Sequence, residues 1–167
     1  MGSTADATQL LDGRVVSTAY WMNESAVVAR LTYLLAEWTD KSRWVFGPGC
    51  GLRISESTVR NPSAMVVSRR SLPSLGSDPV SCTPDLVAEV RRHGTRAASL
   101  RKAVQAYCAA GIPLIWVIYP GTRHAHVLGA DRPRTELGPD GVLDGEDVLP
   151  GFTCSLTKLF AAAEPES

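Results

Sequence analysis

The sequence predicts an α/β domain in which a mixed central sheet is flanked by helices. A short apolar strand at residues 85–90 is followed by an amphipathic helix at 96–110 and by the continuous β-rich run LIWVIY at 114–119. A strand–helix–strand unit of this kind forms a right-handed crossover with parallel pairing, and an uninterrupted apolar strand is typical of burial on both faces. Another helical pattern upstream and several short strands complete the α/β pattern, and 167 residues suffice for one domain with a substantial core.

The first half of the chain predicts a hairpin, a helix and further strands. Residues 9–19 are expected to form a hairpin that turns at Asp12-Gly13. Apolar residues recur at helical spacing over 23–38, where Asn23 or Ser25 could cap the helix. The elements expected after this helix are a bent strand pair at 44–54, a strand at 59–68 and an exposed loop at 71–81.

The second half of the chain contains the predicted crossover unit and the remaining elements. The inner side of the 96–110 helix is expected to consist of Leu100, Ala103, Val104, Tyr107 and Cys108. Shorter strands are expected at 125–128 and 134–137. A last short helix should include Leu156, Leu159 and Phe160.

Composition predicts one soluble domain at 9–163, with disordered ends at 1–8 and 164–167. Acidic and basic residues balance at 17 each, which argues against a strongly electrostatic partner but leaves room for a local basic patch. The four cysteines lack the close spacing of a zinc knuckle, no secretory signal opens the chain, and no apolar run is long enough to span a membrane. We therefore expect a cytoplasmic protein with free thiols and no membrane partner.

Glu89 is the first candidate for chemistry. It lies inside a predicted buried strand, where a carboxylate is costly unless it is paired, hydrogen-bonded or bound to a metal. Alternate strand residues share a face, so Asp85, Glu89 and Arg91 should point the same way. Metal-dependent phosphodiester cleavage uses carboxylates to hold the ion and a cation to stabilise the attacked phosphate. A structural ion pair between Glu89 and Arg91 is the alternative, and spacing alone favours it.

Several segments occur in the order and register of one known family. The most specific are TPDLVAEV, LRKAVQAYCAAGI, PLIWVIYP and LDGEDVLPGF followed by LTKLF, and the upstream segments are LLDGRV, AVVARLTYLL and VRNPSAMVV. In these segments, from about residue 10 to residue 160, the chain resembles the Uma-type restriction endonucleases, a branch of the PD-(D/E)XK nuclease superfamily. The resemblance implies a restriction-endonuclease-like fold and hydrolysis of phosphodiester bonds in DNA with magnesium or manganese.

The active site implied by the resemblance is only partly present. The family has an Asp directly after a Pro, a Glu on the next strand and a Lys on the following helix. The Glu position is Glu89, but the Asp position is Ser63 and the Lys position is Ala103. Lys102 is the neighbouring residue, turned by about 100° around the helix. The metal ligands would then be Glu89 and Ser63, with Lys102 and Arg91 as candidate catalytic cations.

Other family positions also differ. A His that the family often has before the first apolar helix corresponds to Glu24, and a small, polar Ser-Pro stretch corresponds to Arg91-Arg92-His93. A serine hydroxyl is a poor substitute for a carboxylate, because magnesium prefers hard anionic oxygens. The loss of both a carboxylate and a cation from one site argues against efficient cleavage.

Two further clusters stand out. The basic residues near the 96–110 helix could contact phosphates or could simply be solvated; they are Arg91, Arg92, His93, Arg96, Arg101 and Lys102. His124 and His126 would share a strand face, but no third ligand lies near them in the sequence, which favours an ordinary exposed strand over a metal site.

Two hypotheses follow. In one, the chain is a divalent-metal endonuclease that acts on DNA through Glu89, Ser63, Arg91 and Lys102, with Arg91, Arg92, Arg96 and Lys102 binding the nucleic acid. In the other, the nuclease fold remains but catalysis is lost, and the domain binds nucleic acid or protein. A homodimer is compatible with either hypothesis.

Overall fold

The computed structural model describes residues 8–11, 13–17 and 21–161. Its helices are α1 (Met22–Trp38), α2 (Ala97–Ala109) and α3 (Leu156–Ala161), with a 3-10 turn at Pro120–Thr122. Its strands are β1 (Thr8–Leu11), β2 (Arg14–Ser17), β3 (Arg43–Phe46), β4 (Leu52–Ser55), β5 (Thr58–Arg60), β6 (Ala64–Ser68), β7 (Leu86–Val90), β8 (Leu114–Tyr119), β9 (His124–Gly129), β10 (Arg132–Leu137), β11 (Val142–Asp144) and β12 (Thr153–Ser155).

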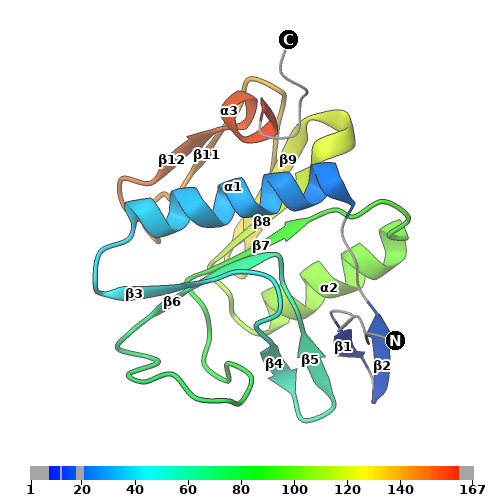
Figure 1. The fold of residues 1–167 in the computed structure, drawn as a ribbon, viewed down its shortest axis with the longest axis vertical. Coiled ribbons are helices and arrows are strands. Elements are labelled where there is room, and N and C mark those ends of the chain that lie inside the picture. The colour runs from blue at the N-terminus through cyan, green and yellow to red at the C-terminus, as the bar shows by residue number, and fades with distance from the viewer. Residues whose placement is uncertain (1–7, 12, 18–20, 162–167) are drawn as a thin grey trace, which may run out of the picture.

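A six-stranded mixed sheet forms the centre of the fold, in the order β10-β9-β8-β7-β6-β3. The β7–β8 pair is parallel and the other pairs in this sheet are antiparallel, so the predicted β7–α2–β8 crossover is confirmed. A four-stranded sheet in the order β2-β1-β5-β4 and the β11–β12 pair are separate from it. The predicted α/β architecture with a mixed central sheet is therefore confirmed (Figure 1).

The two long helices cover opposite faces of the central sheet. Val27, Val28, Leu31 and Leu35 of α1 belong to one buried cluster with Trp116 and other side chains of that face. Ala103 and Tyr107 of α2 belong to a second cluster, together with Val87, Ile115 and Val117. Figure 1 shows α1 passing in front of β7 and β8. Because residues alternate along a strand, Glu89 falls on the α2 face with Val87.

Several predicted boundaries are corrected. Helix α1 begins at Met22, so neither Asn23 nor Ser25 caps it. The predicted strand pair at 44–54 is wrong, because β3 pairs with β6 and β4 pairs with β5 in another sheet. The predicted strand at 59–68 is divided into β5 and β6 by the segment Asn61-Pro62-Ser63, where proline supplies no amide hydrogen for a ladder.

Other sequence predictions agree with the structure. The N-terminal hairpin forms from β1 and β2, and it includes Thr8, which was expected in the disordered N-terminal end. Asp12 and residues 18–20 of the hairpin lie outside the described residues, as do residues 1–7 and 164–167 of the two expected disordered ends. Leu156, Leu159 and Phe160 are buried on α3 as predicted. Within the described part of the chain, no helix is both long and apolar enough to cross a membrane.

Candidate active site

Glu89 lies near the end of β7 with only 8% of its surface exposed. Its Oε1 accepts a hydrogen bond from the hydroxyl of Tyr107, which projects from the inner face of α2. Burial raises the pKa of Glu89 above its ordinary value, while the hydrogen bond from Tyr107 and the charges of Arg92 and Arg60 oppose that shift. The Glu89 carboxylate therefore has a hydrogen-bond donor and nearby positive charges, although the side chains packed between α2 and the sheet are mostly apolar.

The cations that act on Glu89 differ from the one expected. Arg92 and Arg60 lower its pKa, whereas Arg91 extends toward Tyr119, with its guanidinium carbon 6.0 Å from the centre of that ring. The charges that act on the pKa of Glu89 are therefore those of Arg92 and Arg60, and not that of Arg91, which was the expected partner. Strand β7 ends at Val90, so strand alternation does not determine where the next side chains go. Arg60 lies on β5, about thirty residues away in sequence, and sequence reasoning missed it.

Ser63 lies beside Glu89, as its alignment with the family's Asp position predicts. Its amide donates to the carbonyl of Ala88 at 3.0 Å, and its hydroxyl accepts from the amide of Val90 at 2.8 Å. These two partners flank Glu89 on β7. Ser63 is completely buried, and its hydroxyl oxygen, which carries no charge, already accepts one hydrogen bond from a backbone amide.

Ala103 occupies the inner face of α2 one helical turn before Tyr107, and only 5% of its surface is exposed. This is the position at which the family resemblance implies a lysine. Lys102 is exposed on the same helix. Because adjacent helix residues are separated by about 100°, Lys102 does not share the direction that Ala103 and Tyr107 take toward the sheet.

Glu24 connects the start of α1 to the loop between β7 and α2. Its Oε2 accepts from the amide of Trp21 at 2.9 Å, and its Oε1 accepts from the amide of His93. The rings of Trp21 and His93 also pack together, with their centres 4.2 Å apart. Glu24 thus has a structural partner in the loop that carries Arg91 and Arg92.

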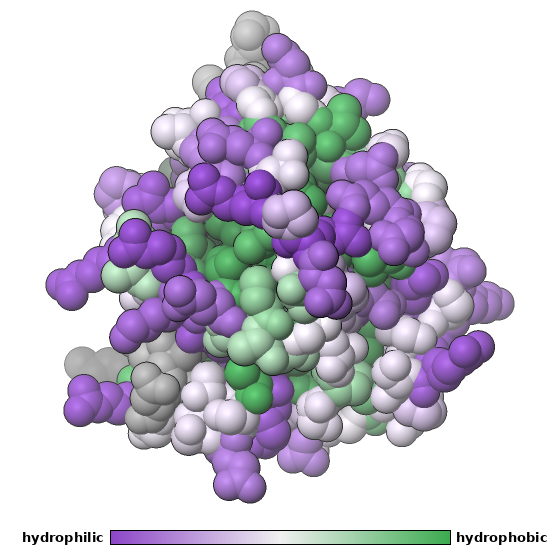
Figure 2. Space-filling model, turned by 180° about the vertical axis from the view of Figure 1, so that it is seen from behind, coloured by the Kyte–Doolittle hydropathy of each residue, from purple (hydrophilic) through white to green (hydrophobic). Residues whose placement is uncertain are grey.

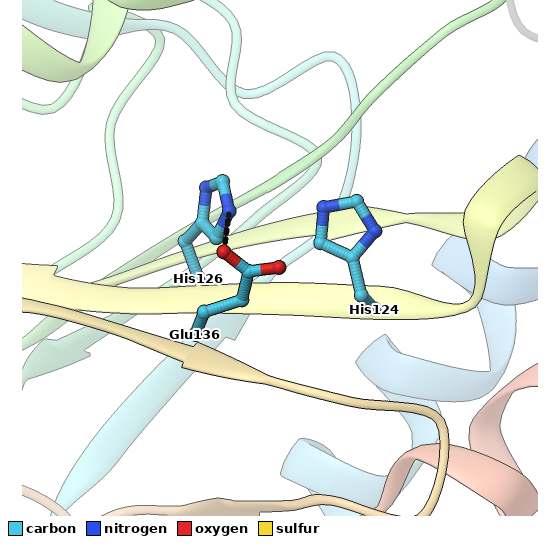
Figure 3. Close-up of side chains that lie close together, drawn as sticks. All are labelled: His124, His126 and Glu136. Atoms are coloured by element: carbon cyan, nitrogen blue, oxygen red, sulfur yellow. Dashed lines mark ion pairs between the residues drawn. The ribbon is translucent and has the colours of Figure 1, made fainter.

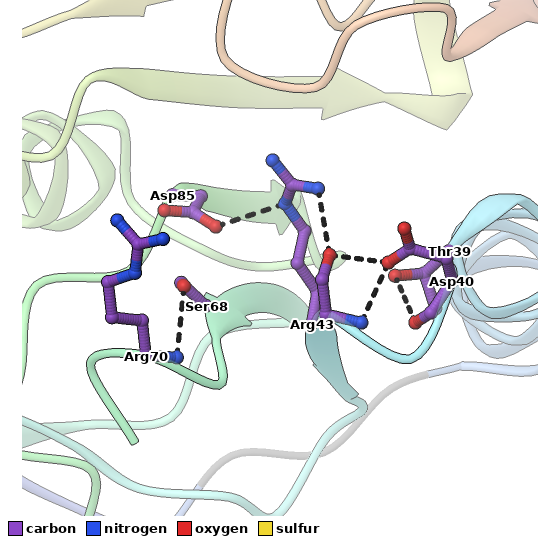
Figure 4. Close-up of polar contacts among 7 residues, drawn as sticks. Thr39, Asp40, Arg43, Ser68, Arg70 and Asp85 are labelled. Atoms are coloured by element: carbon purple, nitrogen blue, oxygen red, sulfur yellow. Dashed lines mark hydrogen bonds and ion pairs between the residues drawn. The ribbon is translucent and has the colours of Figure 1, made fainter. Parts of the chain in front are cut away.

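Asp85, at the opposite end of β7 from Glu89, has a structural partner. The Nε of Arg43 on β3 lies 3.3 Å from its Oδ2, across β6 (Figure 4). Burial raises the pKa of Asp85, and the charge and hydrogen bond of Arg43 oppose that shift. Asp85 therefore does not supply the carboxylate that Ser63 lacks.

A pocket of about 350 Å³ lies between α2 and strands β8 to β10, on the same sheet face as Glu89. Its apolar lining includes Leu100, Val104, Val117 and Leu128, and its polar lining includes Arg91, Arg101, Arg134 and His126. Figure 2, which views the side opposite to that of Figure 1, shows apolar surface hollowed between hydrophilic side chains, the combination that lines this pocket.

The structure therefore divides the predicted basic cluster. Arg92 acts on Glu89, whereas Arg91 and Arg101 line the pocket. Arg96 and Lys102 are exposed at the start and along the surface of α2.

The two histidines of β9 do have a third potential ligand, contrary to the expectation from sequence. Glu136 on β10 pairs directly opposite His126, and ligand atoms of His124, His126 and Glu136 all lie within 4.8 Å of one another. Burial, Arg134 and His124 hold the pKa of His126 below its ordinary value, and Glu136 opposes the shift. Sequence reasoning missed Glu136 because it comes from the neighbouring strand of a hairpin.

The residues around Glu89 do not fit a magnesium ion of the kind that the family resemblance implies. Magnesium sites use hard anionic oxygens in near-octahedral geometry. Among the described residues, Glu89 is the one carboxylate at the positions to which the family resemblance assigns metal ligands, Arg92 and Arg60 lower its pKa, and the hydroxyl of Ser63 accepts a backbone hydrogen bond. The arrangement can hold an anionic side chain in place, but it lacks the paired carboxylates that would concentrate a divalent cation.

The fold and the buried glutamate before α2 define a restriction-endonuclease-like domain. The chain belongs to the Uma2 family, described as "Putative restriction endonuclease", whose model matches residues 3–157. None of the curated proteins matches the chain. Among solved structures, it is similar to a "putative nuclease belonging to DUF820" from Anabaena variabilis ATCC 29413, with a TM-score of 0.81 and 13% identity over 98% of this chain and 95% of that one. At this identity the likeness shows the shared fold.

Replacing Glu89 by Gln is expected to stabilise the protein at neutral and alkaline pH. Because burial raises the folded-state pKa of Glu89, its stabilising contribution is complete below the ordinary glutamate pKa and is lost as pH rises through the folded-state pKa. Glutamine avoids that loss and can still accept from Tyr107. We expect the free energy of unfolding to rise by about 1 kcal/mol at about pH 8 and to change little at about pH 4.

Denaturant unfolding at several pH values measures this difference. The exposed Glu56, in the turn between β4 and β5, offers a control as Glu56→Gln. Equal, pH-independent effects of the two substitutions would contradict the assignment of a raised pKa to Glu89.

Proposed function

We propose that this chain is a nuclease-fold protein that binds nucleic acid and has lost magnesium-dependent cleavage at Glu89. The surroundings of the Glu89 carboxylate support this proposal most strongly. Tyr107 donates to it, Arg92 and Arg60 offset its charge, and the neighbouring Ser63 hydroxyl is bonded to the amide of Val90. These groups would balance the Glu89 carboxylate within the protein itself, without a divalent cation.

Membership of a nuclease family supports nucleic acid as the ligand. The pocket on the Glu89 face of the sheet supports the same proposal, because Arg91, Arg101 and Arg134 surround an apolar floor. Guanidinium groups bind phosphates, and apolar and aromatic side chains accept the flat faces of bases. Arg92, Arg96 and Lys102 would extend this surface along the start of α2.

The alternative is a metal-dependent endonuclease that acts through Glu89, Ser63, Arg91 and Lys102. Family membership supports it, since the family is described by that activity. The missing second carboxylate and the exposure of Lys102 count against it. Magnesium or manganese would be the cofactor of that alternative.

Replacing Arg91 by Glu is expected to weaken DNA binding and its dependence on salt. A lost phosphate contact weakens binding across sequences and reduces the slope of log affinity against log salt by about 1, and a reversed charge adds repulsion. We expect about a tenfold loss of affinity for labelled single-stranded or duplex DNA. Fluorescence anisotropy at several salt concentrations measures both quantities.

Arg30→Glu is the matched control. Arg30 is exposed on α1, which covers the opposite face of the sheet, and its guanidinium lies over Tyr33. Its replacement makes the same change in net charge and should leave affinity nearly unchanged. Equal losses in the two variants would mean that net charge, rather than the pocket, governs binding, and no binding by the wild-type chain would overturn the proposed function.

A further inference from the structure

His124, His126 and Glu136 converge at the outer edge of the central sheet, away from Glu89. Figure 3 shows the carboxylate of Glu136 between the two imidazole rings, with one oxygen directed toward each side. The Nε2 of His126 lies 3.6 Å from Oε2 of Glu136. Only 13% of the His126 side chain is exposed, whereas 60% of the Glu136 side chain is. The group therefore combines a largely buried imidazole with an accessible carboxylate.

The sheet itself holds these side chains together. His124 and His126 are two residues apart on β9 and so point to the same face. Glu136 on β10 pairs directly opposite His126. Directly opposed residues on antiparallel strands have Cβ atoms about 4.5–5.5 Å apart, so only side-chain rotation is required to bring the ligand atoms onto one ion.

Neighbouring side chains orient the imidazoles. The hydroxyl of Thr122 lies 2.7 Å from Nδ1 of His124, which leaves Nε2 as the nitrogen of that ring that can bind a metal ion. The ring of Tyr119 stacks on His124 with centres 4.3 Å apart and planes inclined by 11°, and it meets His126 edge-on. Histidines that bind a metal through one ring nitrogen typically have a hydrogen-bond partner on the other, as Thr122 provides for His124.

The ligand set favours a transition metal over magnesium. Two imidazoles and one carboxylate form a catalytic-type zinc site, with a fourth position left for water or another ligand. Nη2 of Arg134 lies 4.0 Å from Oε2 of Glu136, and Arg134 also lines the adjacent pocket. Because its positive charge repels other cations, a hard cation such as magnesium, which is held mainly by charge, would be disfavoured. Zinc is bound strongly by imidazole nitrogen, and the exposed Arg134–Glu136 pair is weak enough to be displaced.

The site has an entry path and is separate from Glu89. His126 lines the pocket between α2 and β8 to β10, so the open coordination position can be reached from solvent. Glu89, Val117 and His126 follow one another across β7, β8 and β9, which places His126 two strands from Glu89, or about 10 Å. An ion at the histidines would thus not use Glu89 as a ligand.

We propose that His124, His126 and Glu136 bind one zinc ion at the edge of the sheet, with an open coordination position that faces the pocket. This inference does not rest on the proposed loss of cleavage at Glu89. It assigns the chain a metal centre of a different chemical class from the magnesium site of nucleases.

Calorimetric titration of the chelator-treated 167-residue chain with zinc chloride tests the proposal. We expect one zinc per chain, and Glu89→Gln should not change its affinity. His124→Gln, His126→Gln and Glu136→Gln should each weaken binding by more than about tenfold, because even groups that only orient metal ligands change affinity by about 10–100-fold. Glu136 is largely exposed, so its replacement tests the site without threatening the fold.

His93→Gln is the matched control, since His93 is the third histidine of the chain and packs on Trp21 instead. It should bind zinc as the wild type does. Cobalt in place of zinc should give a spectrum without thiolate charge transfer, which separates this site from the four free cysteines. No zinc binding, unchanged binding in all three ligand variants, or a thiolate-type cobalt spectrum would each overturn the proposal.

Discussion

Replacing Ser63 by Asp together with Ala103 by Lys is expected to give a protein that cleaves DNA with magnesium. Ser63 bonds to the residues on both sides of Glu89, so an aspartate there would place a second carboxylate beside the first. Ala103 lies on the inner face of α2, one turn from the tyrosine that reaches Glu89. Because one electrostatic group of this kind changes the rate by about 10²–10³, we expect plasmid nicking at least about a hundredfold above the background seen with the wild type.

Ser63→Asn with Ala103→Lys is the matched control, because asparagine has the shape of aspartate without its charge. This control should not nick DNA. In the Asp–Lys variant, magnesium should also raise the unfolding temperature, since an ion that binds only the folded state stabilises it. An inactive Asp–Lys variant whose unfolding temperature does not respond to magnesium would show that the site has diverged beyond these two positions.

Replacing Glu24 by Ala is expected to lower the free energy of unfolding by at least about 3 kcal/mol. The Glu24 carboxylate is nearly buried and accepts from the amides of Trp21 and His93. Hydrogen bonds to charged groups contribute about 1.5–3 kcal/mol each, and an acid in the first turn of a helix adds about 0.3–1 kcal/mol. Denaturant unfolding measures the loss.

Glu37→Ala on the same helix is the control, since Glu37 is exposed and, among the contacts described for it, bonds only to the hydroxyl of Tyr33, which is also exposed. It should cost no more than about 0.5 kcal/mol. If the two variants were equally stable, Glu24 would not be the link between α1 and the β7–α2 loop.

The central part of the fold could be predicted from local patterns. The β7–α2–β8 unit has an apolar strand, a helix of amphipathic period and a second apolar strand, and each pattern has one physical interpretation at that length. The pairing of residues 44–54 could not be predicted in this way. The glycines at 47, 49 and 51 indicate that the chain changes direction, but they do not determine with which strands the flanking residues pair. The chain changes sheets there, and that choice depends on partners distant in sequence.

In the candidate site, too, some residues could be predicted from the sequence and others could not. Glu89 and Ser63 could be placed side by side from the family pattern, and the structure puts Ser63 against the residues that flank Glu89. Arg60 and Glu136 could not be found in this way. Each reaches its partner across a strand pairing, and pairing register is set by tertiary packing that single-sequence periodicity does not encode.

A cleavage assay on the purified wild-type chain is the most direct test of the lost magnesium site. Supercoiled plasmid and single-stranded DNA would be incubated with magnesium or manganese, beside the variant Glu89→Ala. We predict that the wild-type protein leaves both substrates intact, to the same extent as the variant. Cleavage by the wild type that disappears in Glu89→Ala would contradict the account and show that Glu89 still supports catalysis without a second carboxylate at position 63.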